Sequence, residues 1–340
     1  GIKTNRKMKI CICGGGALGH VCTAVFASQG HDVSVLTNHP VEWEKHIEAT
    51  DPLGRKIIGK VYRVSDNPVV VSQGVDLFLL CVPGGLLEGE LKKIKPFVKR
   101  ETAVGAIVSS TGFFFFAHEI LGNDVCLFGF QRTPFIARVV EYGSKANLLG
   151  YKKQVAIAVE NVPDREGFRK QIERLFITPV VLLDTYYEAS LTNSNPILHT
   201  GRLYSLWKDW NGMSYEHCIL FYREWTEEAA QVIIDMDREF QSLLEILPMN
   251  ARAVPSLLDY YESEDARSLA DKLRTIEAFQ TIQAPMIKTD KGWLPDFKSR
   301  YFTEDFPYGL RFIIDLAHQY GLATPLMDEV YNWGISHVCS

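Results

Sequence analysis

Short apolar runs alternate with segments of helical periodicity over roughly the first 184 residues of the chain. Each run has about five mostly apolar residues, as expected for strands buried on both faces of a parallel sheet. We predict these strands at Met8–Cys13, Asp32–Leu36, Leu77–Val82, Ala103–Val108 and Val125–Phe130. The segments between them predict helices at Ala17–Gln29, Pro40–Ala49, Leu86–Phe97 and Phe113–Leu121. This alternation is typical of a doubly wound α/β domain.

Three further segments complete the prediction for this half. Lys56–Val71 is rich in Val and Ile and contains Asp66-Asn67-Pro68, which predicts a small hairpin excursion. A strand at Gln154–Val159, a helix at Arg165–Phe176 and a strand at Val180–Leu183 would complete the sheet.

The pattern changes after about Tyr186, where long segments with 3.6-residue periodicity dominate. We predict helices at Tyr186–Trp207, Thr226–Leu247, Ala266–Gln280, Leu310–Tyr320 and Leu326–His337. The predicted fold class is therefore α/β: a Rossmann-type doubly wound sheet in residues 1–184, followed by an all-helical domain in residues 185–340.

Composition narrows the functional classes. The chain has 340 residues, 46% hydrophobic and 23% charged, which is ordinary for a soluble globular protein. Its formal net charge of −5 disfavours a nucleic-acid partner, and no apolar run approaches the ~20 residues that span a membrane. The seven cysteines suggest buried thiols in a reducing, cytoplasmic compartment. Because Cys11-x-Cys13 is not a zinc spacing, we expect no metal site.

A glycine turn carries the first chemical signal. Residues 14–19 read Gly-Gly-Gly-Ala-Leu-Gly, which fits G-x-G-x-x-G between a predicted strand and a predicted helix. Gly14 permits the tight turn, Gly16 lets the backbone approach a pyrophosphate, and Gly19 allows close helix–strand packing. With Ala17 and Leu18 in the first helical turn, these residues are expected to bind a dinucleotide at the helix N-terminus. The alternative is a structural turn without a ligand.

The end of the second predicted strand bears on the choice of cofactor. An NAD site usually has an acidic residue here, but the strand continues into Thr37 and Asn38, and the nearest acids are Glu42 and Glu44. Thr37 and Asn38 could bond a 2′-phosphate, so NADPH is favoured and NADH is kept as an alternative.

Two further loops follow predicted strands at their carboxyl ends, where ligands bind in doubly wound sheets. We expect contacts to the cofactor from Val82, Pro83 and Gly84 in one loop and from Ser110 and Thr111 in the other. The alternative for both is an ordinary strand-to-helix turn.

The helical half contains two candidate segments. In Asn193–His199, turn-forming residues and Pro196 interrupt a helical pattern and are expected to kink it beside His199, a natural proton donor near neutral pH. In Ser299–Leu310, Asp305 could orient a histidine, and Arg300 could clamp a carboxylate. The alternatives are a structural histidine, an N-cap aspartate and a surface arginine.

These motifs resemble those of opine dehydrogenases of the octopine/nopaline dehydrogenase type, over nearly the whole chain. The resemblance rests on GGGALG at 14–19, NSNPILH at 193–199 and RYFTEDFPYGL at 300–310. It implies a helical domain of the 6-phosphogluconate dehydrogenase type and reductive condensation of a 2-oxo acid with an amino acid or other amine through an imine. It also implies that His199 exchanges the proton, Asp305 holds its tautomer, Arg300 binds the oxo-acid carboxylate, and Asn195 contacts substrate.

The resemblance leaves the amine open. Gln131 and Arg132 stand at a strand end where members of this family choose their amine, but Gln131-Arg132-Thr133-Pro134 gives no familiar specificity signature. Arg132 suggests an acidic group on one substrate, with a surface charge as the alternative.

Two other functions remain open. A ketopantoate-reductase-like enzyme would reduce a 2-oxo acid without an amine, but that family uses a lysine four residues before an asparagine, and Ala189 stands four residues before Asn193. A dinucleotide-binding regulator without turnover would not need His199 and Asp305. We expect small-molecule partners, and exposed apolar helices in the second domain would accommodate a homodimer.

Overall fold

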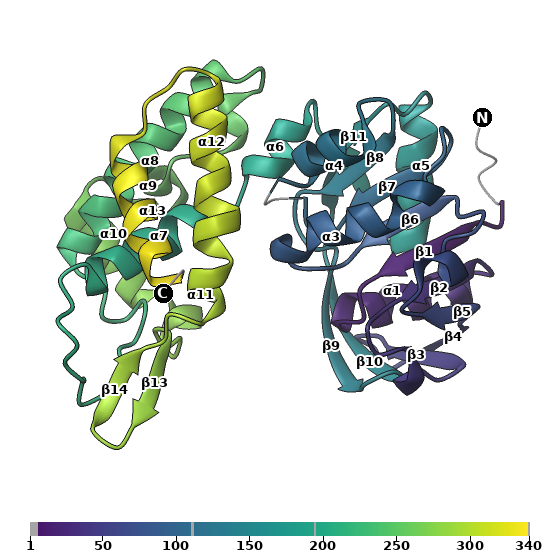
Figure 1. Ribbon diagram of the computed structural model, residues 1–340, viewed down its shortest axis with the longest axis horizontal. Helices are drawn as coiled ribbons and strands as arrows, with labels where there is room; N and C mark the ends of the chain where they lie inside the picture. Colours follow the sequence, from purple (N-terminus) through teal and green to yellow (C-terminus); the bar gives the residue numbers. More distant parts are fainter. Residues whose placement is uncertain (1–5, 110–111, 194, 339–340) are drawn as a thin grey trace. The chain divides into compact units, whose positions relative to one another are not determined.

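The computed structural model describes residues 6–109, 112–193 and 195–338. The chain divides into two compact units, Gly1–Ser190 and Leu191–Ser340 (Figure 1). This division falls within helix α6 (Tyr186–Leu191), six residues after the boundary predicted from the sequence. No helix among the described residues is long and apolar enough to cross a membrane.

An eight-stranded sheet forms the centre of the first unit. Its strand order is β12-β11-β8-β7-β6-β1-β2-β5, and all described neighbours are parallel except β8 and β11. The strands are β1 (Lys9–Cys13), β2 (Asp32–Leu36), β5 (Arg63–Ser65), β6 (Leu77–Leu80), β7 (Ala103–Ala106), β8 (Cys126–Phe130), β11 (Val155–Glu160) and β12 (Val180–Leu182). The predicted Rossmann-type sheet is confirmed.

Both faces of this sheet are covered, as the continuous apolar runs require. Along β1, Ile10 and Ile12 belong to one buried cluster, whereas Cys11 and Cys13 belong to the other, because successive side chains point to opposite faces. The helices of this unit are α1 (Ala17–Ser28), α2 (Pro68–Val71), α3 (Gly84–Ile94), α4 (Phe113–Leu121), α5 (Arg165–Phe176), and the short turns η1 (Pro40–Glu42) and η2 (Lys95–Phe97).

A second, four-stranded sheet packs against α1 in the same unit (Figure 1). Its order is β4-β3-β10-β9, with β3 (His46–Thr50), β4 (Lys56–Lys60), β9 (Phe135–Glu141) and β10 (Lys145–Tyr151). A β-carbon on Gly59 of β4 would lie only 2.6 Å from the side chain of Ala27, so sheet and helix meet closely. This sheet was not predicted.

Two predictions are wrong in this region. The helix predicted at Pro40–Ala49 is the short turn η1 followed by β3, whose residues alternate in burial with period 2. The hairpin predicted at Lys56–Val71 does not form, because β4 pairs with β3 and β5 pairs with β2 in the other sheet.

The second unit is helical, as predicted, with one small hairpin that was not predicted. Its helices are α7 (Asn195–Trp207), α8 (Glu227–Ile246), α9 (Leu257–Tyr260), α10 (Ala266–Thr275), α11 (Arg300–Thr303), α12 (Arg311–Gln319) and α13 (Pro325–Val338), with short turns η3 (Ala251–Ala253) and η4 (Glu277–Phe279) and the π-helical turn η5 (Asp305–Leu310). The hairpin consists of β13 (Met286–Thr289) and β14 (Gly292–Pro295).

The single kinked helix predicted at Tyr186–Trp207 is two helices. α6 ends at Leu191, and α7 begins at Asn195, whose N–H donates to the side-chain oxygen of Asn193 (3.0 Å). Pro196 is the second residue of α7, where its missing N–H breaks no helical hydrogen bond. The proline therefore starts a helix instead of kinking one.

Candidate functional site

The glycine turn between β1 and α1 is built from close backbone approaches. Gly14 has φ of +124°, and a β-carbon there would lie 2.5 Å from the carbonyl oxygen of Cys81. A β-carbon on Gly19 would collide with the carbonyl oxygen of Gly14. Both positions therefore require glycine, and the start of α1 lies directly against the end of β1.

The start of α1 fits an anionic group. Gly16 is the N-cap, it is exposed, and a β-carbon there would meet nothing within 4 Å. No side chain caps the helix, and its first turn, which includes half-buried Ala17 and Leu18, contains no acidic residue. The first N–H groups of α1 therefore face open space with the positive end of the helix dipole, as a bound diphosphate requires.

The end of β2 contains hydroxyl groups and no carboxylate. Thr37 is 7% exposed, and its Oγ1 lies 3.4 Å from the hydroxyl of Tyr142. Asn38 follows it and is exposed. Tyr142 belongs to the β9–β10 turn, 105 residues away in sequence, so sequence reasoning missed it. No local pattern around Tyr142 would have found it.

His20 is a second residue that the sequence analysis missed. It is fully buried on α1, and its Nε2 accepts the N–H of Gly143 (2.8 Å). Nδ1 must therefore carry the ring proton, and it donates to the carbonyl of Gly16 (2.7 Å). Burial lowers the pKa of His20, which favours this neutral form. The ring also stacks on Trp43 at 4.3 Å.

The loop after β6 also reaches the glycine turn. A β-carbon on Gly14 would lie 3.0 Å from Cγ1 of Val82. Pro83 is the N-cap of α3, Gly84 is its first residue, and all three loop residues are half-buried. The two other predicted cofactor contacts, Ser110 and Thr111, lie outside the described residues.

Gln131 and Arg132 directly follow β8, at the carboxyl end of the sheet. Gln131 is half-buried, and its N–H donates to the carbonyl of Ala156 (2.9 Å), whereas Arg132 is exposed. Their assignment to substrate stays a prediction.

In the second unit, the structure brings together His199 and Asp305, which are 106 residues apart. Nδ1 of His199 lies 2.9 Å from Oδ2 of Asp305, and both side chains are largely buried. His199 belongs to α7, and Asp305 is the first residue of the π-helical turn η5. A β-carbon on Gly309 of η5 would lie 3.0 Å from the ring of Pro196, so close packing of η5 on α7 holds the pair.

Aromatic rings surround the other side of His199. The Tyr222 hydroxyl lies 3.5 Å from Nε2, and the Tyr301 ring lies 4.8 Å from the imidazole. Burial raises the pKa of Tyr222, so its hydroxyl stays protonated and can donate to Nε2. Nδ1 of His199 then carries the proton and donates to Asp305, which defines the resting tautomer of the pair.

A buried arginine supports this aromatic shell. Arg202 is one turn after His199, is 1% exposed, and donates through Nε to the carbonyl of Phe221 (2.8 Å). Its guanidinium lies 5.1 Å from the Trp225 ring. Burial lowers the pKa of Arg202 to about 10, so it remains charged at neutral pH and keeps Phe221 and Tyr222 against His199.

The other predicted substrate contacts are exposed. Asn195 precedes His199 by four residues on α7, so both lie on the same helix face. Arg300 is the first residue of α11, five residues before Asp305. Both roles stay predictions.

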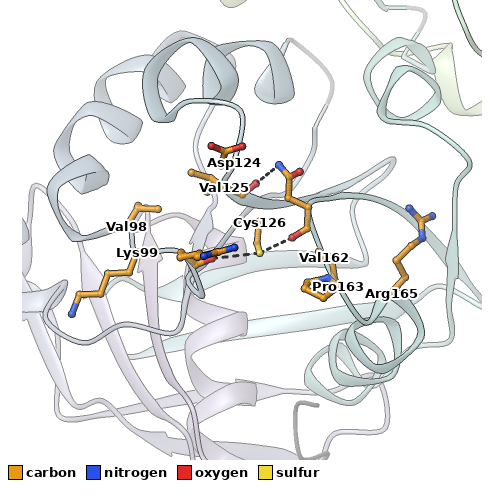
Figure 2. Close-up of a pocket in the computed structure, with 10 residues that line it drawn as sticks. Val98, Lys99, Asp124, Val125, Cys126, Val162, Pro163 and Arg165 are labelled. Atoms are coloured by element: carbon orange, nitrogen blue, oxygen red, sulfur yellow. Dashed lines mark hydrogen bonds between the residues drawn. The ribbon is translucent and has the colours of Figure 1, made fainter.

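One cavity lies elsewhere in the first unit. It has a volume of about 910 Å³ and is formed where β7 and β8 begin, the edge of the sheet opposite the glycine turn (Figure 2). Its lining includes Lys99, Arg100, Asp124 and Cys126, whose thiol donates to the carbonyl of Asn161 (2.9 Å). It contains none of the predicted site residues. Over the described ranges, no cluster of His, Cys, Asp and Glu could hold a metal ion.

Two family models match separate parts of the chain. Residues 182–337 match the family model of the NAD/NADP octopine/nopaline dehydrogenase alpha-helical domain, and residues 10–135 match that of ketopantoate reductase PanE/ApbA. The octopine dehydrogenase of Mizuhopecten yessoensis is 26% identical, covering 96% of this chain and 89% of its own. The helical part of the chain therefore carries the octopine/nopaline dehydrogenase domain, and the chain as a whole is similar to octopine dehydrogenase.

Solved structures of octopine dehydrogenase share the fold of the chain. Octopine dehydrogenase with NADH and L-arginine has a TM-score of 0.86 at 24% identity, covering 98% of this chain and 90% of its own. Octopine dehydrogenase with NADH and pyruvate has a TM-score of 0.84 at 23% identity, covering 98% and 89%. The protein is an opine dehydrogenase-like, NAD(P)-dependent oxidoreductase of the class acting on CH–NH donors.

The neutral state of His20 predicts how stability depends on pH. Because burial lowers its pKa in the folded protein below the ordinary value of 6.5, the unfolded chain binds this proton more strongly. The free energy of unfolding should therefore fall as pH decreases below about 6.5, and the fall should be smaller in His20→Gln. Urea unfolding at pH 7.5 and 5.5 measures this. His46→Gln, an exposed histidine on β3, is the control and should behave like the unmodified protein. An unchanged pH dependence in His20→Gln would contradict the neutral state assigned to His20.

Proposed function

We propose that the protein is an NADPH-dependent opine dehydrogenase that condenses a 2-oxo acid with the amino group of an amino acid or other amine. The observation that carries the proposal is the His199–Asp305 pair, at 2.9 Å, within a helical unit of the octopine/nopaline dehydrogenase family. When bound, the cofactor supplies hydride to the imine carbon. The residues of the chain bind the substrates and handle the proton.

His199 is proposed to exchange the proton at the reacting carbonyl or amine through Nε2. With Nδ1–H directed to Asp305, Nε2 is the nitrogen left for chemistry once Tyr222 gives way to substrate. The carboxylate of Asp305 stabilises the imidazolium that forms when Nε2 accepts a proton. This arrangement supports both dehydration to the imine and its reduction.

The substrate contacts are proposed from the motifs and their positions. Arg300 would bind the oxo-acid carboxylate through paired N–H donors, and Asn195 would contribute a polar contact one turn before His199. Gln131 and Arg132 would face the amine substrate, with Arg132 favouring an acidic group on it. The solved octopine dehydrogenases hold pyruvate and L-arginine, which makes these two compounds the first pair to test.

One feature supports a dinucleotide at Gly14, Gly16 and Gly19, and a second favours NADPH over NADH. The uncapped first turn of α1 supports binding of the diphosphate. At the end of β2, Thr37 and Asn38 supply hydrogen-bonding groups without the carboxylate that would repel a 2′-phosphate. The octopine dehydrogenase structures contain NADH, so NADH remains the alternative.

The second candidate function is reduction of a 2-oxo acid alone, as in ketopantoate reductase. The match of residues 10–135 to that family supports it, but this match covers only the nucleotide-binding half. Ala189 stands where the lysine of that family would be expected, four residues before Asn193. The condensation reaction is therefore the better supported function.

Oxidation of the nicotinamide cofactor should require both co-substrates. Absorbance at 340 nm would be followed with NADPH and with NADH, with pyruvate alone, with a panel of amino acids alone, and with both. Turnover only with both, and a secondary amine dicarboxylate detected by mass spectrometry, is the expected result. Turnover with pyruvate alone would instead establish a simple reductase.

Replacement of His199 by Ala should lower kcat by roughly 10²–10⁴-fold, the usual contribution of a general acid–base. Cofactor affinity should change little, because the predicted cofactor contacts belong to the first unit. Steady-state kinetics and NADPH fluorescence titration measure the two effects. His217→Ala, an exposed histidine of the second unit, is the control. A comparable loss of NADPH affinity would contradict the proposed role.

Replacement of Arg300 by Ala should raise KM for the oxo acid by roughly 10–100-fold, as expected for loss of hydrogen bonds to a charged group. KM for the amine should change much less. Arg238→Ala, an exposed arginine on α8, is the control. An unchanged KM for the oxo acid would exclude Arg300 as its carboxylate clamp.

A further inference from the structure

The tip of the β9–β10 hairpin lies over the glycine turn. A β-carbon on Gly15 would lie 2.7 Å from both the Tyr142 hydroxyl and Oγ1 of Thr37. These two oxygens are 3.4 Å apart, so they occupy one place between the glycine turn and the end of β2. In a Rossmann-type domain this is the place where the adenosine ribose of a dinucleotide is bound.

The hairpin tip is held in place through its backbone. The N–H of Gly143 donates to His20 on α1 (2.8 Å), and its carbonyl accepts the N–H of Glu44 (2.9 Å). Gly143 has φ of +81°, and a β-carbon there would collide with the carbonyl of Glu42, so only glycine fits. The residue next to Tyr142 is therefore fixed from two sides.

Aromatic contacts hold the Tyr142 ring itself. It makes edge-to-face contacts with His20, at 5.2 Å between ring centroids, and with Trp43, at 6.1 Å, while His20 and Trp43 stack on each other. The position of the Tyr142 hydroxyl thus follows from contacts on α1, on the segment after η1 and on the hairpin.

Both hydroxyls have their own hydrogen available to donate. Tyr142 accepts the indole N–H of Trp43 (3.4 Å), and Thr37 accepts the backbone N–H of His39 (3.3 Å). Since each oxygen already accepts a fixed N–H, its O–H can be directed to the other hydroxyl or to an oxygen of a ligand. Two converging O–H donors suit the oxygens of a phosphate, whereas a carboxylate at this place would repel it.

We propose that Tyr142, together with Thr37, binds the 2′-phosphate of the adenosine ribose and so determines the preference for NADPH. The inference rests on the proposed function in one respect: the glycine turn must bind a dinucleotide. In other Rossmann-type domains, the end of β2 alone recognises the 2′-position of the adenosine ribose. Here the β9–β10 hairpin contributes to that recognition through Tyr142, which is 105 residues from Thr37 in sequence. The neighbouring residues Glu42, Glu44 and Lys45 are exposed, and they include both negative and positive charges. Solvent therefore screens their effect on a phosphate bound at Tyr142 and Thr37.

Binding of cofactor fragments to the 340-residue chain tests this proposal without turnover. Isothermal titration calorimetry would measure the affinities of 2′,5′-ADP and 5′-AMP for the unmodified protein and for the variants Tyr142→Phe and Thr37→Val. Tyr151→Phe is the matched control, because Tyr151 lies at the other end of the same hairpin and is equally exposed, at 37%. These variants remove a hydroxyl or replace it isosterically, and circular dichroism would verify their fold.

The unmodified protein should bind 2′,5′-ADP more tightly than 5′-AMP. Tyr142→Phe should lower the affinity for 2′,5′-ADP about tenfold or more, as expected for the loss of one hydrogen bond to a charged group. It should lower the affinity for 5′-AMP by less than about twofold. Tyr151→Phe should change neither affinity.

Three results would overturn the assignment of Tyr142 alone: an unchanged affinity for 2′,5′-ADP, an equal loss for both fragments, or tighter binding of 5′-AMP by the unmodified protein. A different result would overturn the proposed function itself. If the unmodified protein bound neither fragment and neither NADPH nor NADH, the glycine turn would not be a dinucleotide site, and the assignment of Tyr142 would fail with it.

Discussion

The two candidate sites depend on one steric constraint, since each contains a backbone approach that leaves little or no room for a β-carbon. In the first unit, Gly19 of α1 lies against the carbonyl of Gly14, so the helix starts at the end of β1 with its N–H groups directed at the ligand position. In the second unit, Gly309 lies against Pro196, so the π-helical turn reaches α7 closely enough for Asp305 to contact His199. A methyl group at either glycine would separate the backbones that carry the chemistry.

The elements that could be predicted from the sequence are those with a strong periodic signal. Strands buried on both faces, such as β1 and β6, are continuous apolar runs, and the long helix α8 has a clear apolar face. The small second sheet has no such signal. In β9, Ile136 and Val140 are 60% and 59% exposed, so its pattern does not distinguish a strand from a loop. In the same sheet, β3 pairs with β4 and β10, and its alternation of buried residues covers only five positions, too few to separate it from the helix predicted there.

The candidate sites were predictable where their residues are neighbours in sequence. Gly14 to Gly19 form a local motif, and the turn they predict follows directly from backbone sterics. Tyr142 meets Thr37 only because the second sheet folds back onto α1, and that sheet was not predicted. His199 and Asp305 were paired through the resemblance of their motifs to a known family. No spacing rule connects residues 106 apart, and nothing in Asp305–Leu310 announces a π-helical turn.

The two sites use different physical means, and the difference follows from what each must bind. The proposed cofactor site offers backbone N–H groups, two hydroxyls and a histidine kept neutral by burial, so it attracts phosphates without placing a titratable charge against them. The pair of His199 and Asp305 instead joins two groups that can both carry charge, at 15% and 21% side-chain exposure. Partial burial strengthens their attraction relative to bulk water. A site that moves a proton needs such a pair, whereas a site that only holds phosphates is served better by fixed dipoles.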